Sequence, residues 1–316
     1  MRPPHRSAMP DRVLLLEDTN ALLVRNGLPP CHSVSAISDP DTANPVVIAH
    51  ARERRFVVKV TERHRDTLDR QRDVANSLRA ATDLPIPKHF CCADAESKLP
   101  LMVMEWLPGD QLRSVLPNAK NGKLRQLCVS LAKCLSTFHD PRLIDITDES
   151  ETDSGFPLWL YVRTITSLEK SARRGSEKNF TENQVAAIRH FLDARLANTA
   201  RSAIPSLLKV DTDLRDYLAD PINFQITGML DWERVTRGDG IYTLVLTFLR
   251  FWMNDRLEGW QTFLDTYNRF ASVRAEACPQ AEFYLMCRAL IACELNRDVK
   301  RIVDLLIEGN RLPFTT

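Results

Sequence analysis

Acidic residues gather in one segment, residues 207–239, which reads LLKVDTDLRDYLADPINFQITGMLDWERVTRGD. Three of its aspartates, Asp211, Asp216 and Asp231, lie beside short apolar runs of the kind that form strands. Carboxylate oxygens are ligands that Mg²⁺ prefers, and an aligned carboxylate can accept the proton of a hydroxyl group. A single aspartate in a turn more often caps that turn, so the combination of three carries the argument. The segment predicts a site suited to phosphoryl transfer from a nucleotide.

The first hundred residues predict the elements of a small sheet crossed by a helix. Helical spacing at 11–26 is followed by β-branched runs at 45–49 and 54–61, a charged helix at 64–80, and strand-like runs at 88–93 and 100–106. Pro108-Gly109 then interrupts the chain. After it the apolar spacing becomes helical at 124–138 and 183–197, strand pieces return at 207–210 and 222–230, and residues 240–316 are again helical. We read the acidic stretch 148–156 as a surface loop.

Composition excludes several classes of protein. The 316 residues carry 42 Lys and Arg against 41 Asp and Glu, a net charge of +1, so we expect no nucleic-acid partner. No apolar stretch reaches the roughly 18 residues that span a bilayer, so we expect a cytoplasmic protein without a membrane partner. No glycine lies between Gly27 and Gly109, and neither a GxGxxG nor a GxxxxGK loop occurs. The eight cysteines lack zinc spacing and are expected to be buried, reduced thiols.

The acidic segment resembles the catalytic region of the aminoglycoside phosphotransferase and choline kinase family, whose core reads roughly HGDxxxxN, a strand, DW(E/S), and GD. The resemblance implies that Asp211 is the catalytic aspartate, and that Asp216 and Asp231 bind the metal. Lys209 stands where the family has histidine, so the resemblance places it in the catalytic set, where it would orient the loop by a hydrogen bond or pair with Asp211. Asp216 stands where the family has asparagine. Asp213 competes for the catalytic role, but the metal position would then fall on Leu218. The spacing of LDWERVTRGDGIY is similar to the hygromycin phosphotransferase branch.

Among the first hundred residues, the same resemblance implies that Lys59, in RRFVVKV, contacts the nucleotide phosphates. The glutamate that usually pairs with this lysine from the following helix is not evident. Gln71 and Asp73 are nearest to its place, and of these only Asp73 can form an ion pair. Other nucleotide contacts are expected at Ser38 and Asn44 in the glycine-free turn 37–45, and at backbone groups of Glu105 and Leu107 beside the adenine.

The resemblance implies an α+β, two-lobed, protein-kinase-like fold. Its lobes would be an antiparallel sheet lobe over residues 1–106, which binds the nucleotide, and a mainly helical lobe over 107–316. The implied activity is transfer of the γ-phosphate of ATP, or of GTP, to a hydroxyl group of a small molecule, namely an antibiotic, a sugar or an amino alcohol, with Mg²⁺ present. Two alternatives stay open: a kinase of Ser/Thr hydroxyls in a precursor peptide, acting with a protein partner, and a pseudokinase that binds nucleotide or a partner without catalysis. Lys209, Asp216 and the glycine-free turn motivate the last alternative.

Overall fold

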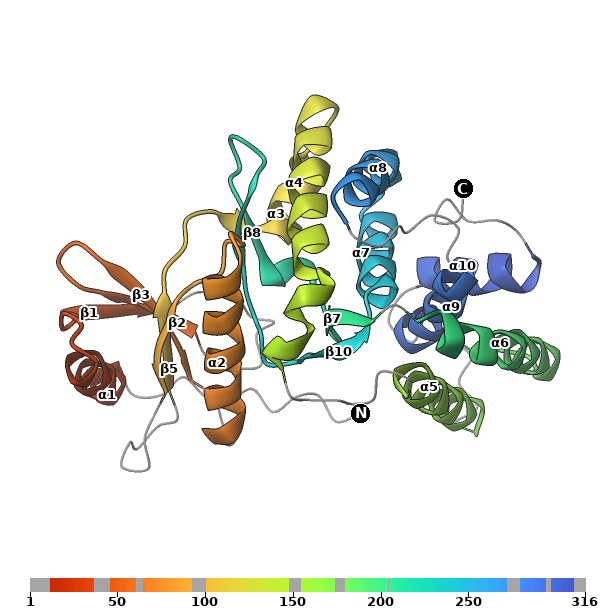
Figure 1. Cartoon of the computed structure of the whole chain (residues 1–316), viewed down its shortest axis with the longest axis horizontal. Helices are drawn as coiled ribbons and strands as arrows, with labels where there is room; N and C mark the ends of the chain where they lie inside the picture. Colours follow the sequence, from red (N-terminus) through yellow and green to blue (C-terminus); the bar gives the residue numbers. More distant parts are fainter. Residues whose placement is uncertain are drawn as a thin grey trace. The chain divides into compact units, whose positions relative to one another are not determined.

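The computed structural model describes residues 12–36, 46–60, 65–92, 101–147, 155–173, 180–203, 205–271, 279–293 and 297–309 (Figure 1). The chain divides into two compact units. Unit 1 comprises Met1–Gly109 together with Thr227–Glu233, and unit 2 comprises Asp110–Ile226 and Arg234–Thr316. Unit 1 therefore takes in seven residues from the acidic segment in addition to the N-terminal part of the chain.

Unit 1 is built on a five-stranded antiparallel sheet with the strand order β1-β2-β3-β5-β4. Its elements are α1 (Arg12–Arg25), β1 (Ser33–Ala36), β2 (Val46–His50), β3 (Arg55–Val60), α2 (Arg65–Ala81), β4 (His89–Cys92) and β5 (Leu101–Glu105). The four strands and two helices expected between residues 11 and 106 are present, and β1 is an additional strand. The sheet forms because these runs are rich in β-branched and apolar residues.

The two faces of this sheet bury different residues. Phe56, Val58 and Val60 of β3 share one core with Leu15 and Leu22 of α1. The alternate residue Val57 packs on the opposite face, against Leu68 of α2 and two methionines of β5. Lys59 lies on this second face, because side chains alternate along a strand. The register pairs Lys59 with Met102 on β5.

Unit 2 is mainly helical. Its elements are β6 (Asp110–Gln111), α3 (Leu112–Val115), η1 (Leu116–Asn118), α4 (Gly122–Phe138), η2 (Pro141–Ile146), α5 (Phe156–Arg173), α6 (Glu182–Ser202), β7 (Pro205–Lys209), η3 (Leu214–Asp216), β8 (Tyr217–Ala219), β10 (Val235–Asp239), α7 (Ile241–Met253), η4 (Leu257–Gly259), α8 (Trp260–Phe270), α9 (Pro279–Cys293) and α10 (Arg297–Ile307). The strand β9 (Ile226–Met229) lies at the boundary of the units. Helix α7 is buried along most of its length. Edge-to-face contacts join Tyr242 of α7 to Phe156 of α5 and to Tyr284 of α9.

Two predicted features of this part of the chain need correction. The strand expected over 222–230 is present only over β9, because Asp220 accepts hydrogen bonds from the N–H groups of Ile222 and Asn223 and so forms a turn. Strands β8 and β10 were not expected from the sequence.

Most of the acidic loop 148–156 lies outside the described residues. Within the described part of the chain, no helix combines the length and the apolar character needed to cross a membrane.

Candidate active site

Lys59 forms two ion pairs within unit 1. Its Nζ lies 3.2 Å from Oδ1 of Asp231 and 3.4 Å from Oε2 of Glu233. The side chains of Lys59 and Glu233 are largely buried, whereas that of Asp231 is 36% exposed. The structure thus joins two of the predicted site residues, Lys59 and Asp231, across 172 positions of sequence. Glu233 is a third member that the sequence analysis did not identify.

Local contacts explain how Asp231 and Glu233 are held beside the sheet. The N–H of Met229 donates a hydrogen bond of 2.8 Å to the carbonyl oxygen of Pro85, in the loop that follows α2. The indole of Trp232 is buried, and its Nε1 donates to the carbonyl oxygen of Met229. Asp231 has a φ of 59°, a left-handed conformation that aspartate tolerates better than most residues. A buried tryptophan therefore anchors the tight bend between the two carboxylates.

The electrostatic balance around Lys59 favours its charged form. Burial of the ammonium group acts to lower the pKa of Lys59, but the carboxylates of Asp231 and Glu233 together outweigh burial. The pKa of Lys59 is consequently raised above its ordinary value. The side chain stays a cation at neutral pH, as a contact for anionic phosphate groups requires.

The residues of α2 that were considered as partners of Lys59 do not pair with it. Asp73 is 65% exposed and accepts a hydrogen bond of 2.8 Å from Nε of Arg72. Gln71, one turn after Leu68, is buried instead. The carboxylate partners of Lys59 in this structure come from the segment around Trp232 rather than from the helix.

In unit 2 the predicted residues Lys209 and Asp216 form an ion pair. Lys209 ends strand β7 with a buried side chain, and its Nζ lies 3.5 Å from Oδ2 of Asp216. The same carboxylate oxygen accepts a hydrogen bond from the N–H of Asp213. The lysine that replaces the family's histidine therefore neutralises the aspartate that replaces its asparagine. The two departures from the motif compensate each other in charge.

Asp211 and Asp213 have different environments. Asp213 lies 2.6 Å from Nη2 of Arg250 on α7, and its Oδ1 accepts from the N–H of Arg215. These bonds fix the turn η3. Asp211 is 40% exposed and lies 3.3 Å from Nη1 of Arg234. Of the two, Asp211 is the more accessible to an acceptor hydroxyl group, which favours it over Asp213 as the catalytic candidate.

The Gly-Asp pair at 238–239 has a structural role in unit 2. Asp239 is fully buried, and its carboxylate accepts hydrogen bonds from the N–H of Ile241 and from the hydroxyl of Tyr284. A Cβ on Gly238 would lie 2.1 Å from Cδ2 of Leu208 on the paired strand β7. A larger residue at position 238 would therefore require the Leu208 side chain to move, and Asp239 fixes the start of α7.

The remaining predicted contacts belong to unit 1. The N–H of Glu105 donates to the carbonyl oxygen of Lys88, so a ligand at Glu105 would have to bind its carbonyl group. Leu107 follows the end of β5 and is half-buried. Ser38 and Asn44 lie outside the described residues. Backbone contacts to adenine at Glu105 and Leu107 stay a prediction.

Among the described residues no three His, Cys, Asp or Glu side chains cluster as a metal cage would need. Mg²⁺ is commonly held by only one or two carboxylates, with phosphate oxygens and water completing its shell. Asp231, in unit 1, and Asp216, in unit 2, offer oxygen ligands of the right chemistry. Each carboxylate now faces a lysine.

Sequence reasoning missed Glu233 and Arg234 as site residues. They are the first and second residues after Trp232, so their closeness in sequence to the candidate metal ligand Asp231 was a usable signal. Their partners, Lys59 and Asp211, lie 174 and 23 positions away, and sequence spacing does not reveal such pairs.

Comparison of the sequence with known proteins identifies its family. Residues 36–281 match the phosphotransferase enzyme family, most of the chain. No protein with curated functional records matches the sequence.

Solved structures of aminoglycoside phosphotransferases share the fold. A thermostable mutant of APH(4)-Ia, in a ternary complex with ADP and hygromycin B, aligns with a TM-score of 0.64 at 15% identity, covering 92% of this chain and 97% of that one. A putative aminoglycoside phosphotransferase from Ralstonia eutropha gives 0.61 at 14% identity over 92% and 94%. The GDP and kanamycin complex of APH(2")-IIIa gives 0.59 at 13% identity over 93% and 98%. The predicted kinase-like fold, an antiparallel sheet followed by a largely helical remainder, is confirmed. These identities do not distinguish branches, so the hygromycin branch stays a prediction.

Proposed function

The chain belongs to the phosphotransferase enzyme family, and from this membership we propose that it transfers the γ-phosphate of ATP to a hydroxyl group of a small molecule. The observation that carries the proposal is the ion pair between Lys59 on β3 and Asp231. A strand lysine beside a candidate metal ligand is the arrangement that positions nucleotide phosphates in kinase-like enzymes. The raised pKa of Lys59 supports the same role.

Each proposed role follows from the chemistry of the side chain. Lys59 binds phosphate oxygens through its ammonium group. Asp231 and Asp216 would each offer a carboxylate oxygen to Mg²⁺, which when bound would neutralise charge on the phosphates. Bound phosphates would compete with Asp231 and Glu233 for Lys59, so these carboxylates keep the lysine charged and placed in the absence of nucleotide.

Asp211 is proposed to orient the acceptor hydroxyl and to take its proton. The hydroxyl oxygen forms a bond to the γ-phosphorus, the bond from that phosphorus to the β–γ bridging oxygen breaks, and the nucleoside diphosphate leaves. Arg234 holds the Asp211 carboxylate at 3.3 Å, which fixes its position for this step.

The ligands bound in similar solved structures suggest which nucleotides and acceptors to test. The solved structures named above hold ADP with hygromycin B, and GDP with kanamycin. We propose ATP as the donor, with GTP as the alternative to test, and a hydroxyl-bearing small molecule as the acceptor. A peptide hydroxyl and an accompanying protein partner stay predictions from the sequence, and a peptide arm belongs in the acceptor screen.

The first test is a thermal-shift titration with ATP, GTP and non-hydrolysable analogues, with and without Mg²⁺. A ligand that binds only the folded state raises the unfolding temperature. We expect a Mg²⁺-dependent rise for the wild type, a reduced rise for Lys59→Met, and loss of the Mg²⁺ dependence for Asp231→Asn. Lys123→Met and Asp265→Asn are matched controls, because both residues are exposed on helices of unit 2.

Three possible results separate nucleotide binding from catalysis. No shift with any nucleotide would overturn the proposed nucleotide site. If nucleotide binds, an acceptor screen by phosphate transfer follows, in which Asp211→Ala is expected to lose about 100-fold or more in rate while still binding nucleotide. Equal transfer by Asp211→Ala and wild type would exclude Asp211 as the proton acceptor. Binding without transfer to any acceptor, small molecule or peptide, would favour the pseudokinase.

A further inference from the structure

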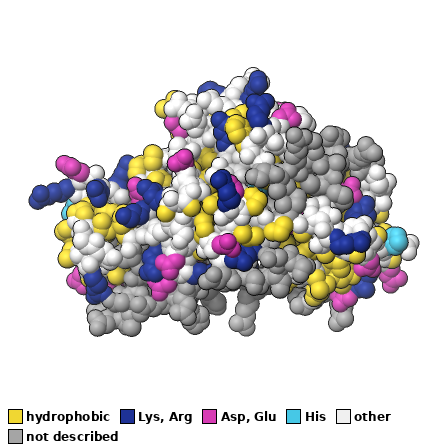
Figure 2. All heavy atoms as spheres, viewed as in Figure 1, with side chains coloured by type: hydrophobic (Ala, Val, Ile, Leu, Met, Phe, Trp, Pro, Cys, Tyr) yellow, Lys and Arg dark blue, Asp and Glu magenta, His cyan; other side chains and the backbone are white. Residues whose placement is uncertain are grey.

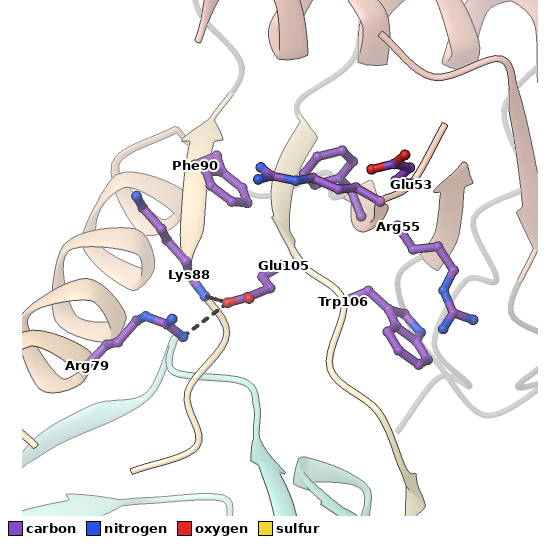
Figure 3. A pocket seen from close by; sticks show the side chains of 9 residues that line it. Glu53, Arg55, Arg79, Lys88, Phe90, Glu105 and Trp106 are labelled. Carbon is purple, nitrogen blue, oxygen red and sulfur yellow. Dashed lines mark hydrogen bonds and ion pairs between the residues drawn. The ribbon is translucent and has the colours of Figure 1, made fainter. Parts of the chain in front are cut away.

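A cavity of about 520 Å³ opens in unit 1 at the end of the sheet where β3 begins and β5 ends (Figure 3). Its lining combines two phenylalanines, Phe56 and Phe90, with charged residues of the β2–β3 turn, the end of α2 and the loop before β4. The size falls within the range of sites for small organic ligands. The cavity is therefore large enough to hold such a ligand.

Phe56 and Glu105 of the cavity lining lie on the sheet face opposite Lys59, whereas Arg55 of the lining shares the face of Lys59. Phe56 pairs directly with Glu105 across the β3–β5 ladder, so both side chains point to the same face. Phe90 meets the Phe56 ring edge to face, with ring centroids 5.7 Å apart. Lys59 is three residues further along β3, about 10 Å away, and points to the other face. The side of the cavity with the two phenylalanines is thus distinct from the proposed phosphate site, and of the predicted adenine contacts only Glu105 lines the cavity.

The rim carries more positive than negative charge. Four cationic residues line the cavity against two carboxylates, Glu53 and Glu105. Nη1 of Arg79 lies 3.0 Å from Oε2 of Glu105, which also accepts a hydrogen bond from the N–H of Lys88 (Figure 3). One carboxylate is therefore already matched to a cation and a backbone donor. A net excess of two positive charges is left around the opening.

Cations and rings are placed together at two points of the lining. Nζ of Lys88 lies 5.5 Å from the centroid of the Phe90 ring. The guanidinium carbon of Arg55 lies 3.4 Å from the ring centroid of Trp106. An aromatic surface beside cations complements a ligand that has a flat apolar body and an acidic group.

We propose that this cavity binds a small organic anion with a planar ring, of the aromatic carboxylate class. The ring would pack on Phe90, which is partly exposed, while Phe56 is 2% exposed and lies behind Phe90 in the sheet core. The carboxylate would be bound by Lys88 and Arg54 at the rim. Arg79 stays with Glu105 in this arrangement, because it also donates to the carbonyl oxygen of Ile86 and so closes the loop after α2.

Calorimetric titration of the full chain with naphthalene-2-carboxylate, in the absence of nucleotide, tests this proposal. We expect a dissociation constant of about 1 mM or lower for a ligand of this size. Lys88→Gln and Arg54→Gln are each expected to weaken binding about tenfold, because each removes a charge-assisted hydrogen bond. Lys133→Gln is the matched control, since Lys133 also lies over a phenylalanine, Phe270, but in unit 2.

Two further ligands separate the contributions of ring and charge. The uncharged isostere naphthalene-2-carboxamide and inorganic phosphate are both expected to bind more weakly than the carboxylate. The proposal is overturned if the carboxylate shows no binding, if the amide or phosphate binds as tightly, or if Lys88→Gln leaves the affinity unchanged. None of these results depends on nucleotide binding, so failure here leaves the proposed phosphotransferase activity intact.

Discussion

Lys209 and Asp216 replace a histidine and an asparagine of the motif that this chain resembles, and they do so as a pair. The ammonium group is buried at the end of β7, and its carboxylate partner is 3.5 Å away. Removing one member of a buried pair leaves an uncompensated charge, which costs far more than removing both. The two substitutions are therefore best understood as one change that conserves local charge.

A double-mutant cycle measures this coupling. Lys209→Met is expected to lower the free energy of unfolding by about 3 kcal/mol, because the Asp216 carboxylate loses its counter-charge. Adding Asp216→Asn should restore part of that loss, giving a coupling energy of about 1–3 kcal/mol. Urea denaturation of the four proteins at pH 7 provides the values. Strictly additive effects would show that the two side chains act independently.

At the scale of elements, helices α4 and α8 are joined by a buried polar contact. His139, which follows the last residue of α4, lies with its Nδ1 2.8 Å from the hydroxyl of Tyr267 on α8. Burial lowers the pKa of His139 to about 3. The imidazole is therefore neutral in the folded protein throughout the physiological range.

This contact makes the stability of unit 2 sensitive to acid. The unfolded chain takes up a proton at His139 below about pH 6.5, whereas the folded chain does so only near pH 3, so acid favours unfolding in that window. Between pH 7 and pH 5 the wild type should lose about 2 kcal/mol more unfolding free energy than His139→Gln. Denaturant titrations at both pH values, with His190→Gln as an exposed control, measure the difference. An identical loss in wild type and His139→Gln would contradict the assignment.

The elements differ in how far the sequence reveals them. Strand β3 contains three valines and strand β5 is apolar over its first four residues, and these hydrophobic patterns were sufficient to identify both strands. Strand β10 reads VTRGD and shows no apolar alternation. Its burial depends on Gly238, which allows close approach to Leu208, and on hydrogen bonds that satisfy Asp239. These contacts join residues that are distant in sequence, so no local sequence pattern predicts them. The ion pairs of Lys59 with Asp231 and Glu233 could not be predicted for the same reason.

At the scale of the whole molecule, unit 1 is discontinuous in sequence. Residues 227–233 contribute both carboxylate partners of Lys59, the buried Trp232 and the backbone bond from Met229 to Pro85. The sequence analysis expected a boundary after residue 106, and the motif beginning at Leu230 gave no indication that it packs with the sheet.

A fragment of residues 1–109 would lack these contacts. We expect faster amide hydrogen exchange in β3 and β5 of the fragment than in the full chain, because local protection follows local stability. Adding a peptide of residues 225–235 should slow that exchange. A mutant peptide with Trp232→Ala serves as the control. Equal protection in the fragment and the full chain would show that the returning segment adds nothing to the stability of the sheet.

The discontinuity also sets an order of events during protein synthesis. When Gly109 leaves the ribosome, another 124 residues, 110–233, must still leave it before the segment with Asp231 and Glu233 can reach the sheet. At about 5–20 residues per second this interval is roughly 6–25 s. During that time Lys59 on the nascent sheet has neither of these carboxylates beside it. The first-made part of the protein can therefore complete its native contacts only after most of the chain has been made.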